Sequence, residues 1–224
     1  MQYGVIYSDP PYHFKAYSEE TGIDRAPQIH YPCMTIPQIV QFHREHRYLA
    51  APDAVLLLWV PMPHTHQMPA LMDALGFTFK ASGFVWVKPS LEFAEVIADF
   101  DAGEIKPRTK KNKLLFAFGG GFGTRKNTEI CWLGSRGHPK RLDAGIEEVV
   151  CESELVLEPR GQHSAKPGCI YGRIEKLFRG PYLEMFARKS PRAGWDAMGN
   201  QVGLLDHGPV KTKGHQDLRV EERG

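Results

Sequence analysis

Short apolar runs alternate along the chain with segments of helical periodicity. The run "DAVLLLWV", residues 53–60, is continuously apolar, which is typical of a strand covered on both faces of a parallel sheet. Further strands are predicted at residues 5–7, 128–137, 146–152 and 182–188. Helices are predicted at residues 34–51, 64–76 and 166–178, the last beginning near Pro167. This alternation predicts an α/β domain with a largely parallel sheet and helices on both of its faces.

Three of the remaining segments have patterns of their own. Residues 77–88, "FTFKASGFVWVK", hold two strand-like runs around Ser82 and Gly83, which predicts a hairpin. Residues 15–28 are charged and lack periodicity, and they predict a loop long enough to act as a lid over an active site. Residues 90–127 carry acidic and basic clusters and predict an insertion or a mobile excursion.

The composition narrows the class of protein. A chain of 224 residues is long enough for one buried core, so we predict a single domain over residues 1–205 and a polar tail over 206–224. The four cysteines form no CxxC pair, and His64 and His66 point apart on a helix, so no metal site or disulfide framework is predicted. The N-terminus has no apolar leader and no apolar run is long enough to span a bilayer, which predicts a cytoplasmic protein without membrane contact.

The stretch "VIYSDPPYHF" is the first candidate for chemistry. Asp9 follows an apolar strand, and Pro10 and Pro11 stop the chain from continuing as a helix or a central strand. Because prolines lack N–H groups, the loop offers only acceptors, the Asp9 carboxylate and the Pro10 carbonyl, beside the flat ring of Tyr12. Such a loop suits a planar ligand with an amino group, although an ordinary Asp-Pro turn explains the motif alone equally well.

Three segments together carry a resemblance to a known family: "DPPY" at 9–12, "HSAKP" at 163–167 and "LEMFARKSPRAGWDAMGNQ" at 183–201. In this order and spacing the chain resembles the MT-A group of S-adenosylmethionine-dependent adenine N6-methyltransferases, named after the seventy-kilodalton subunit of a messenger-RNA methyltransferase. The resemblance implies a Rossmann-like methyltransferase domain of permuted order, in which the catalytic segment precedes the cofactor-binding segment.

The resemblance also implies roles for single residues. The catalytic segment is Asp9, Pro10, Pro11 and Tyr12, where Asp9 and the Pro10 carbonyl hold the adenine amino group and Tyr12 stacks on the base. The cofactor-binding residues are Asp9, Lys166, Arg188, Asn200 and Gln201, with Lys166 pairing with the methionine carboxylate of S-adenosyl-L-methionine and the two amides reaching its ribose hydroxyls. After transfer the cofactor leaves as S-adenosyl-L-homocysteine, and no metal is implied.

The sequence departs from the family pattern in two places. Larger members carry a segment before the Asp-Pro-Pro strand that contacts the cofactor adenine, and here that strand begins at residue 3. We therefore expect either an adenine pocket that is closed differently or weaker cofactor binding. Tyr12 stands where the family usually has a tryptophan, a milder change because both rings stack.

Basic residues point to a polynucleotide substrate. The segment "KPRTKKNK" at 106–113 predicts an arm that follows phosphates, and a solvated loop is the alternative. The predicted nucleic-acid contacts are Arg25, Tyr31, Lys106, Arg108, Lys110, Lys111 and Arg125. A base in a duplex must leave the stack to reach Asp9, so the target is a flipped or single-stranded base.

The predicted reaction is methyl transfer to adenine N6 in DNA, and three alternatives stay open. RNA adenosine is the first, because the choice of DNA rests on a short chain without zinc fingers or long charged extensions. Cytosine N4 in DNA is the second, because the same acceptors fit any base with an amino group. The third is a catalytically silent subunit that binds nucleic acid, and assembly as a homodimer or heterodimer is also left open.

Overall fold

A single mixed sheet forms the centre of the molecule in the computed structural model. The model describes residues 1–13, 32–89, 127–142, 152–161, 165–203 and 206. In these residues seven strands pair in the order β5-β3-β4-β2-β1-β6-β7. Their bounds are β1 Tyr3–Ser8, β2 Ala50–Val60, β3 Thr78–Val87, β4 Thr128–Arg136, β5 Leu155–Leu157, β6 Tyr182–Met185 and β7 Trp195–Met198. Strand β4 runs antiparallel to both of its neighbours, and the other pairings are parallel.

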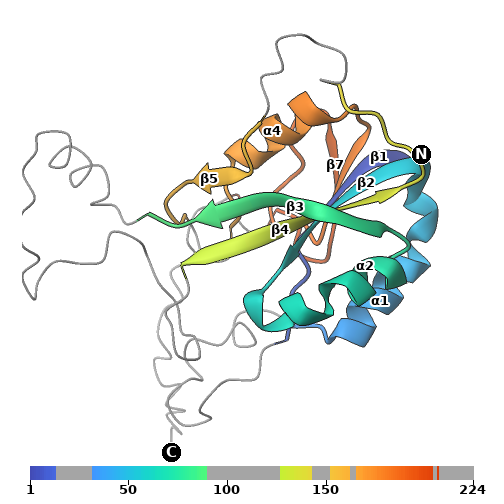
Figure 1. The fold of residues 1–224 in the computed structure, drawn as a ribbon, viewed down its shortest axis with the longest axis horizontal. Helices are drawn as coiled ribbons and strands as arrows, with labels where there is room; N and C mark the ends of the chain where they lie inside the picture. The colour runs from blue at the N-terminus through green and yellow to red at the C-terminus, as the bar shows by residue number, and fades with distance from the viewer. Residues whose placement is uncertain (14–31, 90–126, 143–151, 162–164, 204–205, 207–224) are drawn as a thin grey trace, which may run out of the picture.

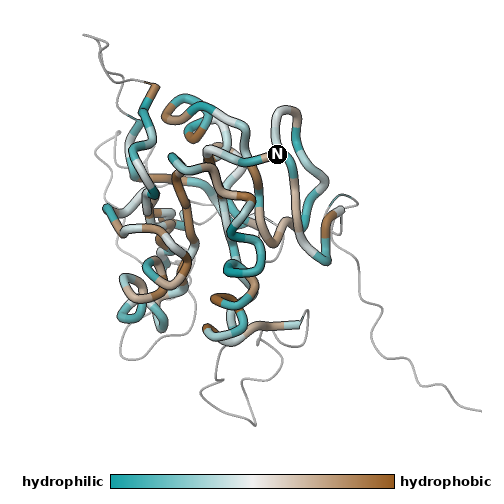
Figure 2. Tube along the Cα trace, turned by 90° about the vertical axis from the view of Figure 1, so that its right-hand side faces the viewer, coloured by the Kyte–Doolittle hydropathy of each residue, from teal (hydrophilic) through white to brown (hydrophobic). Residues whose placement is uncertain are grey.

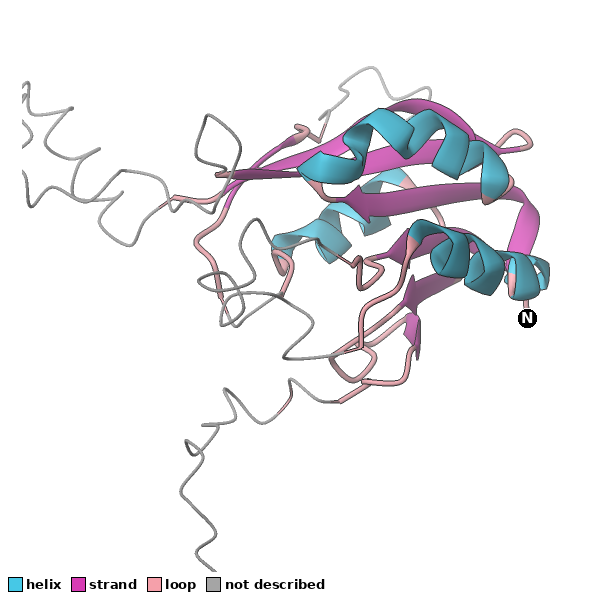
Figure 3. Ribbon diagram, turned by 90° about the horizontal axis from the view of Figure 1, so that it is seen from below, coloured by secondary structure: helices cyan, strands magenta, loops and turns pink. Residues whose placement is uncertain are grey.

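Helices cover both faces of this sheet (Figures 1 and 3). Helices α1 (Ile36–Glu45) and α2 (Met68–Ala74) pack on one face, and α4 (Cys169–Leu177) packs on the other. Two short 3-10 helices, η3 (Arg47–Leu49) and η4 (Met62–Gln67), precede β2 and α2. The predicted α/β architecture, with a largely parallel sheet between helices, is confirmed. None of the helices in the described residues is long and apolar enough to cross a membrane.

Strand β2 shows how one apolar run serves two cores. Leu56, Leu58 and Val60 belong to the cluster beneath α1 and α2, whereas Val55, Leu57 and Trp59 belong to the cluster beneath α4. Successive side chains of a strand point to opposite faces, so both sets are buried only in a strand covered on both sides. Figure 2 shows hydrophobic (brown) and hydrophilic (teal) stretches alternating along the chain trace.

The predicted hairpin at residues 77–88 is wrong, because β3 continues through it as one strand. The register against β4 shifts between Ser82 and Phe84, so the irregularity in the sequence marks a bulge and no chain reversal. A Cβ atom at Gly83 would lie 2.8 Å from Leu57 Cδ2 and 3.3 Å from the Cys131 carbonyl oxygen. The absence of a side chain at Gly83 therefore allows β3 to pack closely against Leu57 and Cys131.

This packing gives a testable stability effect. We expect Gly83→Ala to lower the free energy of unfolding by about 1–3 kcal/mol, because the added methyl group overpacks a full core. Gly172→Ala is the matched control: nothing lies within 4 Å of its added Cβ in α4, so the helix gains up to about 1 kcal/mol. Urea unfolding measures the change in the free energy of unfolding for both variants, which we expect to have opposite signs. Equal changes in the two variants would contradict the packing role of Gly83.

Other element boundaries differ from the predictions. The helix predicted over 64–76 begins as η4, and the helix predicted from Pro167 begins at Cys169. Strand β6 ends at Met185, because Phe186 takes a left-handed φ of 62°. Strand β7 was not predicted; its four residues are too short to show alternation.

Some predicted segments lie outside the described residues. They are the lid at 15–28, nearly all of the excursion at 90–127, nearly all of the strand at 146–152, and nearly all of the tail at 206–224. The domain boundaries therefore stay predictions.

Candidate active site

Three chain segments meet at one edge of the sheet, where β1, β6 and β7 end. The Asp9 amide donates to the Met185 carbonyl at 3.5 Å, so the segment after β1 runs beside the end of β6. The Ala187 amide donates to the Met198 carbonyl at 3.0 Å, which joins the segments after β6 and β7. In parallel sheets, ligands bind outside this carboxyl edge.

Gly199 allows the last two of these segments to touch. A Cβ atom there would lie 3.0 Å from both the amide nitrogen and the carbonyl oxygen of Ala187. Only a residue without a side chain fits this approach. The fold thus gathers the predicted cofactor residues Arg188, Asn200 and Gln201 on neighbouring segments beside Asp9.

Lys166 reaches the same place from the loop before α4. Its ammonium nitrogen lies 2.9 Å from Asp9 Oδ2 and 3.3 Å from Glu129 Oε2, and 5.2 Å from the centre of the Trp59 ring. The predicted catalytic carboxylate and the predicted cofactor lysine are therefore in direct contact. Asp9 and Lys166 are 157 residues apart in the sequence, so only the fold brings these two segments into contact.

Glu129 and Lys88 complete this charge cluster, and sequence reasoning missed both. Lys88 forms an ion pair with Glu129, and its ammonium lies 4.6 Å from the centre of the Trp86 ring. Because β4 is antiparallel, its first residues lie at the carboxyl end of β2 and β3. A glutamate near the start of an apolar strand was the available signal, but its position depends on the direction of that strand.

The charges of the cluster alternate from Lys88 through Glu129 and Lys166 to Asp9. Burial raises the pKa of Asp9, while Lys166, and to a smaller degree Arg188, act in the opposite direction. Burial also disfavours the ionised forms of Glu129 and Lys166, but the attraction of their oppositely charged partners outweighs the effect of burial. Lys166 and Lys88 lower the pKa of Glu129 to about 2, and Asp9 and Glu129 raise the pKa of Lys166 above its usual value.

The low pKa of Glu129 predicts a pH-dependent stability. A carboxylate whose pKa is lower in the folded state stabilises that state above its unfolded pKa, and the stabilisation is lost as the pH falls through the folded pKa. We therefore expect Glu129→Gln to cost most stability near pH 7 and progressively less between about pH 5 and pH 2. Urea unfolding across this range measures it. The control is Glu45→Gln, the same change on an exposed surface of α1, and a cost at Glu129 that does not vary with pH would contradict the assignment.

The Asp-Pro-Pro-Tyr segment is fixed by its own backbone bonds. The Tyr12 amide donates to the Pro10 carbonyl at 2.9 Å, and the Met34 amide donates to the Pro11 carbonyl at 2.6 Å. The Tyr12 ring is only 3% exposed and stacks on His64, with ring centres 5.5 Å apart. One of the two Pro10 acceptor positions is therefore in use, and one face of Tyr12 already has a neighbour.

Aromatic side chains pack beneath the charge cluster of Lys88, Glu129, Lys166 and Asp9. The Trp59 indole donates to the Tyr7 hydroxyl at 2.8 Å, and the Tyr7 ring packs edge-on against Tyr171 and Trp195. The Tyr171 hydroxyl donates in turn to Glu184 at 2.9 Å. These contacts tie β1, β2, α4, β6 and β7 together directly under the segment that carries Asp9.

The loop of Lys166 is anchored at both ends. On one side, Gly168 donates its amide to Glu158 at 3.0 Å, and the Trp86 indole donates to the Glu158 carbonyl at 2.6 Å. A pocket of about 240 Å³ lies here, and Lys166 and Lys189 are among its lining residues. Two ammonium groups in one pocket suit an anionic group.

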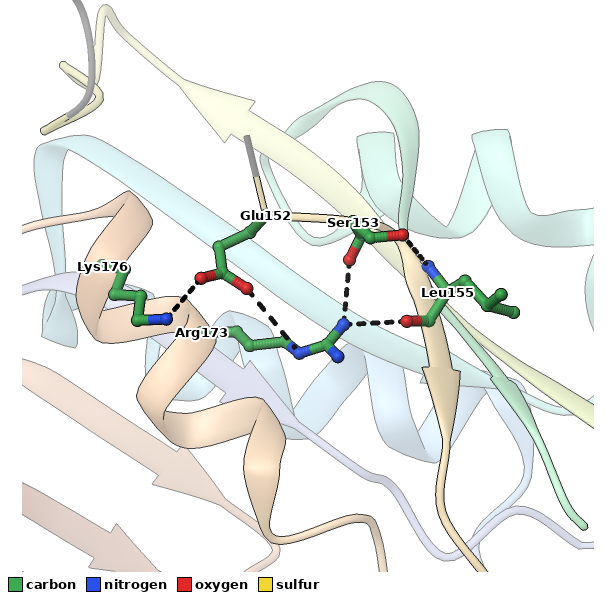
Figure 4. A network of polar contacts seen from close by, with 5 residues as sticks. All are labelled: Glu152, Ser153, Leu155, Arg173 and Lys176. Atoms are coloured by element: carbon green, nitrogen blue, oxygen red, sulfur yellow. Dashed lines mark hydrogen bonds and ion pairs between the residues drawn. The ribbon is translucent and has the colours of Figure 1, made fainter. Parts of the chain in front are cut away.

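On the other side, α4 is bound to the edge strand β5 (Figure 4). Arg173 donates to the carbonyl oxygens of Ser153 at 3.0 Å and Leu155 at 2.8 Å, and Lys176 pairs with Glu152 at 2.7 Å. The helix that follows Lys166 is therefore held to the sheet by backbone acceptors as well as by its apolar face.

The predicted nucleic-acid contacts cannot be placed against this cluster. Arg25, Tyr31, Lys106, Arg108, Lys110, Lys111 and Arg125 all lie outside the described residues. Among the described residues, no group of three or more His, Cys, Asp or Glu side chains is arranged to hold a metal ion.

Comparisons with known proteins cover nearly the whole chain. The MT-A70 family model matches residues 3–201. The chain is also similar to the type II methyltransferase M.MunI of Mycoplasma sp, with 24% identity over 224 residues that cover 90% of this chain and 78% of that protein. The family match includes Asp9, Lys166, Arg188, Asn200 and Gln201.

Proposed function

Because this chain belongs to the MT-A70 family, whose methyltransferases use S-adenosylmethionine, we propose that it transfers a methyl group from S-adenosylmethionine to the N6 amino group of adenine in DNA. The observation that carries the proposal is the Asp9 carboxylate at the carboxyl end of β1, in contact with Lys166 and beside the segments that follow β6. The similarity to a type II methyltransferase favours DNA over RNA.

The residues at this edge fit the proposed cofactor. Lys166 lines a pocket in which it can pair with a carboxylate, and Arg188 lies within electrostatic reach of Asp9. Asn200 and Gln201 follow Gly199, and each side chain can donate and accept, as two neighbouring ribose hydroxyls require. When bound, the cofactor supplies an electrophilic methyl group on sulfur.

Asp9 and Pro10 act on the amino group of the base. The lone pair of an exocyclic adenine nitrogen is delocalised into the ring, so the nitrogen is a weak nucleophile. Hydrogen bonds from its two N–H groups to the Asp9 carboxylate and to the remaining acceptor position of Pro10 favour the positive charge that develops during attack. Pro11 adds no competing N–H donor. Tyr12 is the stacking partner that we propose for the base; because its ring is stacked on His64 and 3% exposed, the other face has to be uncovered when the base enters.

Lys166 and Glu129 set the charge that Asp9 presents. In this structure Lys166 donates to Asp9, the same group that the amino group needs as an acceptor. Glu129 gives Lys166 a second carboxylate at 3.3 Å, so the ammonium keeps a partner when Asp9 binds the base. Burial raises the pKa of Asp9, and the ammonium of Lys166 opposes this rise and favours the ionised carboxylate.

The base has to leave its stack before it reaches Asp9. We propose that the residues predicted from sequence to contact nucleic acid, the basic segment 106–113 with Arg25, Tyr31 and Arg125, hold the flanking strand. Contacts of this kind involve phosphates, so binding should weaken steeply as the salt concentration rises.

The proposal is tested by methyl transfer to nucleic acids. The chain is incubated with labelled S-adenosylmethionine and with DNA and RNA oligonucleotides of matched sequence, in single-stranded and duplex form. The products are digested to nucleosides and separated. We expect the label in N6-methyldeoxyadenosine, and none with Asp9→Ala.

The other outcomes separate the alternatives. Label in N4-methyldeoxycytidine would support methyl transfer but contradict adenine as the target base. Label only in RNA would support methyl transfer but contradict DNA as the substrate. A chain that binds S-adenosylhomocysteine but labels nothing would indicate a subunit that needs a partner. A chain that binds no cofactor would overturn the proposal.

A further inference from the structure

His43 is a buried polar residue beside the candidate site that the proposed mechanism does not use. It lies on α1, only 6% of it is exposed, and its Nε2 atom is 3.3 Å from the hydroxyl of Ser8. Ser8 is the last residue of β1, is fully buried, and precedes Asp9 in the chain. The pair therefore joins α1 to the strand that ends at the catalytic carboxylate.

The same imidazole also contacts the segment that leads to Arg188. Its ring centre lies 5.9 Å from that of Phe186, and the neighbouring Phe42 ring packs on Phe186 at 4.6 Å. Phe186 is the first residue after β6 and has a φ of 62°, a conformation that is rare for a residue with a side chain. Such strain persists only where the surrounding structure holds it.

His43 is neutral under ordinary conditions. Burial, and to a smaller degree the neighbouring His46, lowers its pKa to about 4. A neutral imidazole keeps both a donor and an acceptor nitrogen, which suits a hydroxyl partner. The residue is therefore not suited to exchange protons near pH 7.

We propose that His43 is a positioning residue that fixes the Asp9 segment and the Phe186 turn at a constant separation. The inference rests on the proposed function, in which Asp9 holds the amino group and the segment after β6 holds the cofactor. Both segments begin where a strand ends, and α1 contacts both through adjacent side chains, Phe42 and His43. Misplacement of one relative to the other by about 1 Å is enough to slow a transfer about 100-fold.

The test compares His43→Leu, which keeps the packing but removes both nitrogens, with His43→Gln, which retains polar atoms near the position of Nε2. Ser8→Ala removes the partner hydroxyl alone. Leu71→Val is the control, because Leu71 is a buried residue of α2 and none of the hydrogen bonds and ring contacts described above involves it. Two readouts are used: kcat and KM for an adenine-containing DNA oligonucleotide, and hydrogen exchange of the Asp9 and Ala187 amides without cofactor.

We expect His43→Leu and Ser8→Ala to lower kcat about 10- to 100-fold, with KM and the Kd for S-adenosylhomocysteine within about threefold of wild type. The Asp9 and Ala187 amides should both exchange faster, and His43→Gln should restore most of kcat. Unchanged exchange in His43→Leu, or equal losses in Leu71→Val, would overturn the positioning role. A wild-type chain that transfers no methyl group and binds no S-adenosylhomocysteine would overturn the proposed function, while the exchange readout would still decide on His43.

Discussion

Asp9→Asn is expected to lower kcat by a factor of about 100 to 1,000 while the chain stays folded. The amide keeps one acceptor oxygen near the position of the carboxylate but loses the negative charge. The mechanism needs that charge, because positive charge develops on the amino nitrogen during attack. Glu129, the other carboxylate of the described cluster, is already shared by Lys88 and Lys166. Steady-state transfer to an adenine-containing DNA oligonucleotide measures the loss.

The stability of this variant separates chemistry from folding. Burial raises the pKa of Asp9, so the ionised carboxylate costs folding free energy at neutral pH, and the uncharged amide removes that cost. Lys166 still has Glu129 as a partner. We therefore expect the free energy of unfolding to stay the same or to rise slightly. Asp73→Asn, the same change on the exposed side of α2, is the control and should leave kcat unchanged. A folded Asp9→Asn chain with full activity would contradict the role of Asp9.

The fold could be predicted as far as local patterns decide it. Strand β2 could be predicted from the sequence, because seven successive apolar residues are buried only when both faces of a strand are covered. Helix α1 was predicted from its apolar periodicity, but the predicted range 34–51 runs past its end at Glu45 into η3 and the first residues of β2. The family, inferred from three segments and their order, is confirmed by the family model.

Prediction failed where tertiary contacts decide. Gly83 was taken for a turn residue, but its lack of a side chain serves the approach of Leu57 and Cys131 from two other strands. Strand β7 forms because the edge of β6 is available for parallel pairing, and a pattern of four residues in the sequence does not reveal such a partner. These features depend on distant parts of the chain.

The candidate site divides in the same way. The loop from Asp9 to Tyr12 stood out because a carboxylate and two prolines follow an apolar run, whereas Lys166 was assigned from the family resemblance. Glu129 did not, since it enters the cluster only through the antiparallel direction of β4. His43 could not be identified from the sequence either, because a histidine on an amphipathic helix does not indicate which strand it will contact.

Lys166→Met is expected to weaken binding of S-adenosylhomocysteine about 10- to 100-fold. The methionine side chain has a similar length but no charge, and a charge-assisted hydrogen bond to a carboxylate is worth about 1.5–3 kcal/mol. Isothermal titration measures the loss. An analogue without the amino-acid carboxylate, methylthioadenosine, should bind wild type and Lys166→Met about equally. Lys80→Met is the control, because Lys80 is an exposed residue of β3 that does not line the pocket of Lys166.

The variant also leaves Asp9 and Glu129 close together without the cation between them. Removing one partner of a largely buried ion pair is costly, because the remaining charge has lost both water and its partner. Here that charge is mainly Asp9, since Glu129 keeps its ion pair with Lys88. Lys166→Met should therefore be less stable near pH 7, and the deficit should shrink in acid as the two carboxyls take up protons. Lys166→Arg keeps the charge and should recover stability without restoring full cofactor affinity, because a planar guanidinium does not reproduce the geometry of an ammonium. A Lys166→Met chain that binds S-adenosylhomocysteine as wild type does would contradict the carboxylate partner assigned to Lys166, and would leave the lysine with Asp9 and Glu129 alone.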